Sequence, residues 1–222
     1  MFKKILIAED QQSISRGLQS TLTELDIPHI ETADYCDNAL LKLKSSLLKN
    51  VPFDLLITDL SFREDHKLRK LYSGEDLIRE VRKIQPNLDI IVFSIENRVG
   101  VIKKLIDEYR INGYISKGRR EAEDMGKAIK SILQGTSYYS EDIVALLRNS
   151  SNISEVSTSD KLILGLLAKG LNQKQISEHF KANNIPSGSK RSIEYRLQDL
   201  KILFEADTLP HLISIVKDIG LI

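Results

Sequence analysis

The chain has 222 residues, of which 41% are hydrophobic and 28% are charged, and its formal net charge is +1. This composition indicates a folded globular protein with room for two ordinary domains, and the near-neutral charge excludes polyanion binding over the whole surface. The single cysteine, Cys36, excludes an intramolecular disulfide framework, fits a reducing compartment, and is interpreted as a small apolar filler near the end of a strand. No apolar run reaches the roughly 18 residues of a membrane-spanning helix. Because Glu9 and Asp10 interrupt the first apolar run too early for a signal peptide, we expect a cytoplasmic protein without membrane association.

Residues 1–135 alternate short apolar runs with segments of helical periodicity, which is typical of β-α units around a parallel sheet. The expected strands are 4–8, 29–33, 53–58, 89–93 and 113–115. Apolar residues recur every three or four positions in the expected helices, which are 14–25, 39–47, 77–84, 101–109 and 125–133. Five such units predict one doubly wound α/β domain with a five-stranded parallel sheet, a flavodoxin-like arrangement.

Residues 136–155 are expected to form a connection between two domains. Ser140 is suited to cap a short helix that ends near Leu147, and the polar, aperiodic stretch 149–154 is interpreted as a linker.

Residues 156–222 show no strand pattern and predict an all-α domain of four helices. The spacings Ser157 to Asp160 and Asn172 to Gln175 indicate capping boxes at the start of the first two helices, and Gly170 fits the position after the first. The third and fourth helices are expected around 193–203 and 209–216.

Polar and charged side chains follow four of the five expected strands, and they are Glu9 and Asp10, Asp59, Ser94 and Lys117. Ligands of open parallel sheets bind beyond the carboxyl ends of the strands, so we expect these groups to form one site. Neighbouring acids repel one another unless a cation lies between them, and a hard ion such as Mg²⁺ suits carboxylates and a backbone carbonyl. One acid at such a position is more often a solvated cap, but five suitable groups together predict a site for a cation and a phosphoryl group.

The segments Leu6-Ile7-Ala8-Glu9-Asp10, Leu56-Ile57-Thr58-Asp59-Leu60, Val92-Phe93-Ser94 and Tyr114-Ile115-Ser116-Lys117 resemble the receiver domain of two-component response regulators over residues 2–134. The resemblance implies that Asp59 is a nucleophile that accepts a phosphoryl group from the phosphohistidine of a sensor histidine kinase. It also implies that Mg²⁺ is held by Glu9, Asp10, Asp59 and the backbone carbonyl of Ser61. Lys117 and Ser94 would contact the phosphoryl group, and Tyr114 would rotate inward on activation.

Several features depart from the receiver pattern, one of which is Ile95, bulkier than the usual alanine or glycine after Ser94. Glu9 stands where aspartate is commoner, although it still offers a carboxylate. The loop after Asp59 is lengthened by the charged stretch 63–70, no proline follows Asp59, and Gly74 takes the place of the usual glycine several residues late. The loop is either a solvated charged segment or a specificity element for the kinase, since it borders the reactive site.

The segment 167–177 and the ending 212–222 resemble the helix-turn-helix domain of LuxR-type regulators over residues 156–222. A receiver followed by such a domain implies a transcriptional response regulator that binds double-stranded DNA as a homodimer and is switched by Mg²⁺-dependent phosphorylation. Leu209, Leu212 and Val216 are candidate dimer contacts, and their competing role is the core of the bundle, which we favour for two of the three.

The third helix of the C-terminal domain is the expected recognition helix. Residues 181–201 carry a local charge of +3, from Lys181, Lys190, Arg191, Arg196 and Lys201 against Glu194 and Asp199. Ile193 and Leu197 are expected to face the core. The expected DNA contacts are base contacts from Glu194, Tyr195 and Gln198, and phosphate contacts from Lys190 and Arg191. The turn 181–189 is longer than usual, and Glu194 stands where a basic residue is common.

Three other interpretations remain open from the sequence. The receiver could be degenerate and regulate through protein contacts without phosphorylation, although the full set of site residues argues against this. The C-terminal helices could form an interaction module that does not bind DNA. A phosphatase with an aspartyl nucleophile would carry Asp-x-Asp after the first strand, whereas this chain has Glu9-Asp10-Gln11, so we expect a phosphoryl acceptor and no enzyme.

Overall fold

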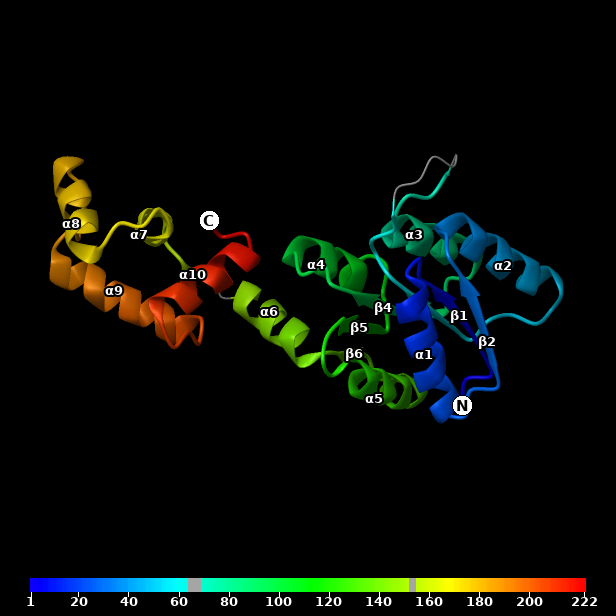
Figure 1. Cartoon of the computed structure of the whole chain (residues 1–222). Helices are drawn as coiled ribbons and strands as arrows, with labels where there is room; N and C mark the ends of the chain where they lie inside the picture. The colour runs from blue at the N-terminus through cyan, green and yellow to red at the C-terminus, as the bar shows by residue number, and fades with distance from the viewer. Residues whose placement is uncertain (64–68, 152–154) are drawn as a thin grey trace. The chain divides into compact units, whose positions relative to one another are not determined.

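The structure is a computed structural model that describes residues 1–63, 69–151 and 155–222. It consists of two compact units, one formed by Met1–Glu96 and Val101–Ile143 and the other by Asn97–Gly100 and Val144–Ile222 (Figure 1). Most of the charged loop 63–70 and the end of the expected linker 149–154 lie outside the described residues. No helix among the described residues has both the length and the apolar character needed to cross a membrane.

The first unit is built on a parallel sheet, as the alternating pattern predicts. Its strands are β1 (Lys4–Ala8), β2 (His29–Ala33), β3 (Leu55–Thr58), β4 (Asp89–Ser94), β5 (Gly113–Ser116) and β6 (Tyr138–Tyr139). Their order is β2-β1-β3-β4-β5-β6, and every neighbouring pair is parallel. The predicted doubly wound fold is therefore confirmed, but the sheet has a sixth strand that the sequence did not reveal.

Among the described residues, five helices connect the strands of this sheet. They are α1 (Gln12–Glu24), α2 (Cys36–Leu48), α3 (Gly74–Ile84), α4 (Val99–Asp107) and α5 (Glu121–Leu133). Alternate strand residues such as Ile5 and Ile7 share one buried cluster with Leu22 of α1 and Met125 of α5, because successive side chains of a strand point to opposite faces. Cys36 is buried, as expected of a small apolar filler, and it lies three residues after the end of β2 as the first residue of α2.

Helix α6 (Glu141–Ser151) follows β6 and is longer than expected. Asn149 to Ser151 continue the helix, so the first part of the stretch interpreted as a linker is helical. The sequence signal was misleading because polar residues with no apolar period can still extend a helix that has already begun.

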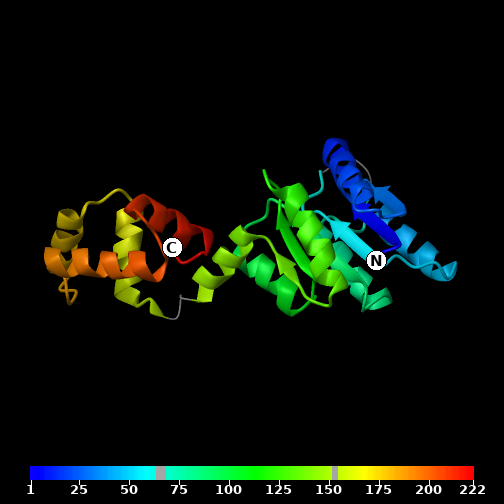
Figure 2. The same cartoon turned by 90° about the horizontal axis from the view of Figure 1, so that it is seen from below.

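The C-terminal unit is a helical bundle, drawn in yellow to red in Figure 2. Its helices are α7 (Thr158–Ala168), α8 (Gln173–Ala182), α9 (Lys190–Leu203) and α10 (Leu209–Asp218). Both expected capping boxes are present, and Gly170 has φ +90°, a conformation that favours glycine. Ile193 and Leu197 of α9 are buried in the core together with Leu212 and Val216 of α10.

Candidate functional site

The carboxyl ends of four adjacent strands bring the predicted receiver residues together. In the parallel register, Ala8 of β1 lies beside Thr58 of β3, and Ser94 of β4 lies beside Ser116 of β5. Glu9, Asp59 and Lys117 each follow directly after one of these strands, so their side chains meet at one edge of the sheet.

Asp59 is nearly enclosed, with 4% of its surface exposed, and its two carboxylate oxygens have different surroundings. Oδ1 accepts hydrogen bonds from the backbone N–H groups of Leu60 (2.6 Å) and Ser61 (3.3 Å) and from the hydroxyl of Ser94 (2.6 Å). Oδ2 accepts a hydrogen bond from the ammonium group of Lys117 at 2.6 Å. The backbone and Ser94 therefore fix the orientation of the carboxylate, and Oδ2 faces a positive charge.

Lys117 lies between two buried carboxylates. Its Nζ atom is 2.6 Å from Asp59 and 2.7 Å from Oε2 of Glu9, a residue that is only 1% exposed. Burial raises the pKa of Glu9 despite the neighbouring ammonium group. Burial alone would lower the pKa of Lys117, but its hydrogen bonds to Asp59 and Glu9 outweigh that effect and raise the pKa. The lysine is therefore held as a cation beside Asp59.

Asp10, another predicted metal ligand, has a separate partner. Its Oδ2 atom accepts a hydrogen bond from the backbone N–H of Arg63 at 2.7 Å. Within the part of the chain that the structure describes, no three His, Cys, Asp or Glu side chains are gathered around a common metal position. Glu9 and Asp59 thus meet at Lys117, whereas Asp10 contacts the beginning of the loop after Asp59.

Gly74 is the residue that allows the chain to pass close behind Asp59. A Cβ atom added to Gly74 would lie 1.8 Å from the carbonyl oxygen of Asp59, which is far inside van der Waals contact. The backbone N–H of Gly74 donates to the carbonyl of Leu60, and Ser61 pairs with Ser73 in an antiparallel bridge. Only glycine therefore fits this position, and it closes the base of the long loop.

Asp37 is a residue near the site that the sequence gave no reason to select. Its Oδ2 atom accepts hydrogen bonds from the backbone N–H groups of Lys70 (3.1 Å) and Leu71 (3.4 Å), and Arg69 lies 4.5 Å from the ring centroid of Tyr35. The end of the long loop is thus fastened to the beginning of α2. No sequence signal indicated this contact, because an acid in the first turn of a helix is usually explained by the helix dipole.

Tyr114 of β5 is fully buried. Its hydroxyl donates a 2.7 Å hydrogen bond to the backbone carbonyl of Glu96, in the connection between β4 and α4, and burial raises the pKa of the phenol. The side chain thus links the β5 strand to the segment that follows Ser94.

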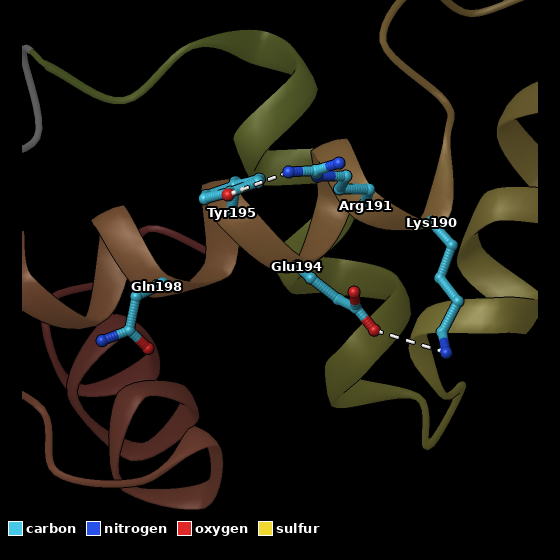
Figure 3. Close-up of a pocket in the computed structure, with 5 residues that line it drawn as sticks. All are labelled: Lys190, Arg191, Glu194, Tyr195 and Gln198. Carbon is cyan, nitrogen blue, oxygen red and sulfur yellow. Dashed lines mark hydrogen bonds and ion pairs between the residues drawn. The ribbon is translucent and has the colours of Figure 1, made fainter.

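The five residues predicted to contact DNA line one open hollow on α9, with a volume of about 610 Å³, and they are Lys190, Arg191, Glu194, Tyr195 and Gln198 (Figure 3). Their spacing of one, three and four residues places them on one face of the helix. Tyr195 is 61% exposed, and the guanidinium of Arg191 lies 5.6 Å from its ring centroid. Lys190 pairs with Glu194 at 3.4 Å, so the unexpected acid partly neutralises a cation of the same face.

Arg196 does not lie on this face, although it contributes to the positive charge counted for residues 181–201. Its guanidinium forms two hydrogen bonds with the carboxylate of Asp160, at 2.6 Å and 2.7 Å. One of the five basic side chains of the segment is therefore neutralised within the domain.

Comparison with known proteins agrees with this geometry. The sequence matches the response regulator receiver domain family over residues 5–130. The transcriptional regulatory protein RcsB of Salmonella typhi and that of Escherichia coli K12 are each 25% identical over 173 residues, which is 75% of this chain and 74% of theirs. A solved RcsB–DNA complex shares the fold over 97% of this chain and 98% of that chain, with 22% identity and a TM-score of 0.57. The chain therefore belongs to the response regulator receiver domain family, and its fold, including that of the C-terminal helical domain, is shared with RcsB.

Proposed function

We propose that this protein is a transcriptional response regulator that accepts a phosphoryl group on Asp59 and binds double-stranded DNA through α9. The observation that carries the proposal is the arrangement of Asp59, whose carboxylate is fixed through Oδ1 while Oδ2 faces Lys117. The phosphodonor would be a sensor histidine kinase. The protein would take up one phosphoryl group per receiver, so it would act as an acceptor and a switch, not as an enzyme.

The transfer can be written in terms of side chains of this chain. Oδ2 of Asp59 forms the new bond to phosphorus, and the histidine nitrogen of the donor leaves with the electron pair of the broken bond and then takes up a proton. Leu60 and Ser94 hold Oδ1, so the carboxylate keeps its orientation during attack. Lys117, already a cation beside Oδ2, balances the negative charge that the phosphoryl group brings into the site.

Mg²⁺ would be held by Glu9, Asp10, Asp59 and the backbone carbonyl of Ser61. All of these donors are oxygen atoms, which suits a hard cation, and the buried Glu9 and Asp59 already share one positive group. When bound, Mg²⁺ would neutralise charge on the phosphoryl oxygens. Asp10 would have to exchange its hydrogen bond with the N–H of Arg63 for the ion.

The DNA-binding part of the proposal rests on the exposed face of α9. It presents hydrogen-bonding groups at Glu194 and Gln198, an exposed aromatic ring at Tyr195, and basic groups at the beginning of the helix (Figure 3). One solved structure contains two RcsB dimers bound to two parallel DNAs, and its RcsB chain is 22% identical to this chain with a TM-score of 0.52. We propose that this protein is a homodimer as well. Leu212 and Val216 are fully buried in the bundle, so they are not the dimer contacts. Because DNA is the proposed target, the proposed location is the cytoplasm.

Two measurements test this function. Intact mass after incubation with acetyl phosphate and Mg²⁺ should increase by one phosphoryl group, and Asp59→Asn should show no increase. Selection of bound fragments from genomic DNA, with and without acetyl phosphate, should recover a common sequence that the phosphorylated protein enriches. A receiver that takes up no phosphoryl group but still selects DNA would instead support regulation through protein contacts.

A further inference from the structure

The bidentate pair of Arg196 and Asp160 joins two helices inside the C-terminal domain. Nε of Arg196 lies 2.6 Å from Oδ1 of Asp160, and Nη2 of Arg196 lies 2.7 Å from Oδ2. Asp160 is only 2% exposed, and a planar guanidinium that meets a carboxylate through two parallel hydrogen bonds fixes the orientation of both groups.

Asp160 is itself held rigidly at the beginning of α7. Its Oδ2 atom accepts hydrogen bonds from the backbone N–H of Ser157 at 2.8 Å and from the hydroxyl of Ser157 at 2.6 Å, which completes the capping box. The pair therefore ties the first turn of α7 to the middle of α9.

Arg196 lies on the other side of α9 from the proposed DNA-binding face. At about 100° per residue, its side chain leaves the helix roughly 170° from the centre of the face formed by the five residues in Figure 3. Of the buried residues of α9, Leu200 and Ile193 lie nearest to it on the helix surface. A phosphate bound at the centre of that face, near Glu194, would lie on the opposite side of α9 from Arg196.

We propose that Arg196 supports DNA recognition as a positioning residue and makes no contact with a phosphate. This inference rests on the proposed DNA-binding function of α9. Apolar contacts of Ile193, Leu197 and Leu200 attract α9 to the bundle, but they are not directional. The pair with Asp160 fixes the rotation of α9 about its axis, so that Glu194, Tyr195 and Gln198 meet the base edges in register.

The experiment compares three single variants of the full chain: Arg196→Lys, Arg196→Met and Asp160→Asn. Each is phosphorylated with acetyl phosphate and Mg²⁺ and titrated with two duplexes, namely the genomic fragment selected by the wild type and a scrambled duplex of equal length. Titrations cover a series of salt concentrations, because each phosphate contact adds about 0.9 to the slope of log K against log[salt]. Lys190→Met, which removes a proposed phosphate contact from the DNA-binding face, serves as the comparison.

If Arg196 is a positioning residue, all three variants should weaken binding to the selected fragment by at least about tenfold. Binding to the scrambled duplex and the salt slope should stay at wild-type values. Arg196→Lys is decisive because it keeps the charge but loses the bidentate geometry. Asp160→Asn keeps Arg196 and frees its charge, so a phosphate-contacting arginine would bind DNA as well as or better than in the wild type.

The proposal is overturned if Arg196→Lys binds like the wild type while Arg196→Met lowers the salt slope by about 0.9. It is also overturned if the variants lose the same factor on both duplexes, because a partly unfolded domain loses specific and non-specific binding alike. A wild-type protein that binds neither duplex would refute the DNA-binding function itself, before any variant is compared.

Discussion

The ammonium group of Lys117 lies 2.6 Å from Oδ2 of Asp59, and the same group lies 2.7 Å from Glu9. One cation thus compensates two buried carboxylates at the carboxyl edge of the sheet. Removing one partner from such a buried group leaves uncompensated charge, which costs far more than the loss of an exposed ion pair.

Lys117→Met should lower the free energy of unfolding by about 3 kcal/mol at pH 7, because Glu9 and Asp59 would remain buried without their cation. Urea unfolding of both proteins measures the difference. Lys127→Met is the matched control, since Lys127 pairs with Glu123 on the exposed surface of α5, and it should leave the free energy unchanged. Equal losses for the two variants would show that Lys117 is not the charge partner of this cluster.

Glu9 makes the stability of the receiver depend on pH in a defined direction. Its pKa in the folded protein is raised above the ordinary value of 4.5 by burial, so the folded state binds this proton more tightly than the unfolded state does. The contribution of Glu9 is therefore favourable at low pH and is lost as pH rises from the ordinary value through the raised one. Glu9→Gln should gain stability relative to the wild type as pH rises from about 4.5 to 7, as measured by urea unfolding. A difference that stays constant, or that shrinks with rising pH, contradicts the raised pKa.

Gly74→Ala should destabilise the receiver by about 2–3 kcal/mol, because the new methyl group would overlap the carbonyl oxygen of Asp59 and force the backbone apart. Gly17→Ala in α1 is the control, because a Cβ atom there meets nothing within 4 Å. That substitution should instead stabilise the helix by about 0.5–1 kcal/mol. Thermal unfolding of both variants tests the contrast. If Gly74→Ala left the stability unchanged, the backbone at position 74 would lie farther from the carbonyl oxygen of Asp59 than the structure places it.

Ser94→Ala should still accept a phosphoryl group but should lose the increase in DNA affinity that follows phosphorylation. The hydroxyl of Ser94 is buried and already within 2.6 Å of Asp59, so it is placed to respond when Asp59 is modified. The ratio of DNA affinities with and without acetyl phosphate should fall close to one. Ser94→Thr keeps the hydroxyl and should keep the ratio above one, and an unchanged ratio in Ser94→Ala would exclude the residue from the switch.

Much of the fold could be predicted because its signals are local. The apolar runs of β1, β3 and β4 and the capping boxes at Ser157 and Asn172 are written in a few consecutive residues. Strand β6 has only two residues, Tyr138 and Tyr139, which is too short for any period. It exists because the free edge of β5 offers backbone partners, as in the bond from the N–H of Ser140 to the carbonyl of Tyr114, and a contact of this kind is not visible in sequence.

The functional residues, too, could be predicted where the sequence signal is local and could not be predicted where it depends on contacts across the fold. Glu9, Asp59 and Lys117 could be selected because each directly follows a strand, and the parallel sheet then brings them together. The partner of Asp10, the anchoring of the long loop on Asp37 and the pairing of Arg196 with Asp160 depend on side-chain directions across the fold. Counting Arg196 as part of a basic surface was the natural inference from sequence, since charge alone does not reveal a partner 36 residues away.

The most direct test is the intact mass of the full chain after incubation with acetyl phosphate and Mg²⁺, followed by peptide mapping of the modified residue. An increase of one phosphoryl group on Asp59, absent without Mg²⁺ and absent in Asp59→Asn, is the predicted result. A mass that does not change, or a phosphoryl group carried by another residue, would contradict the proposed switch.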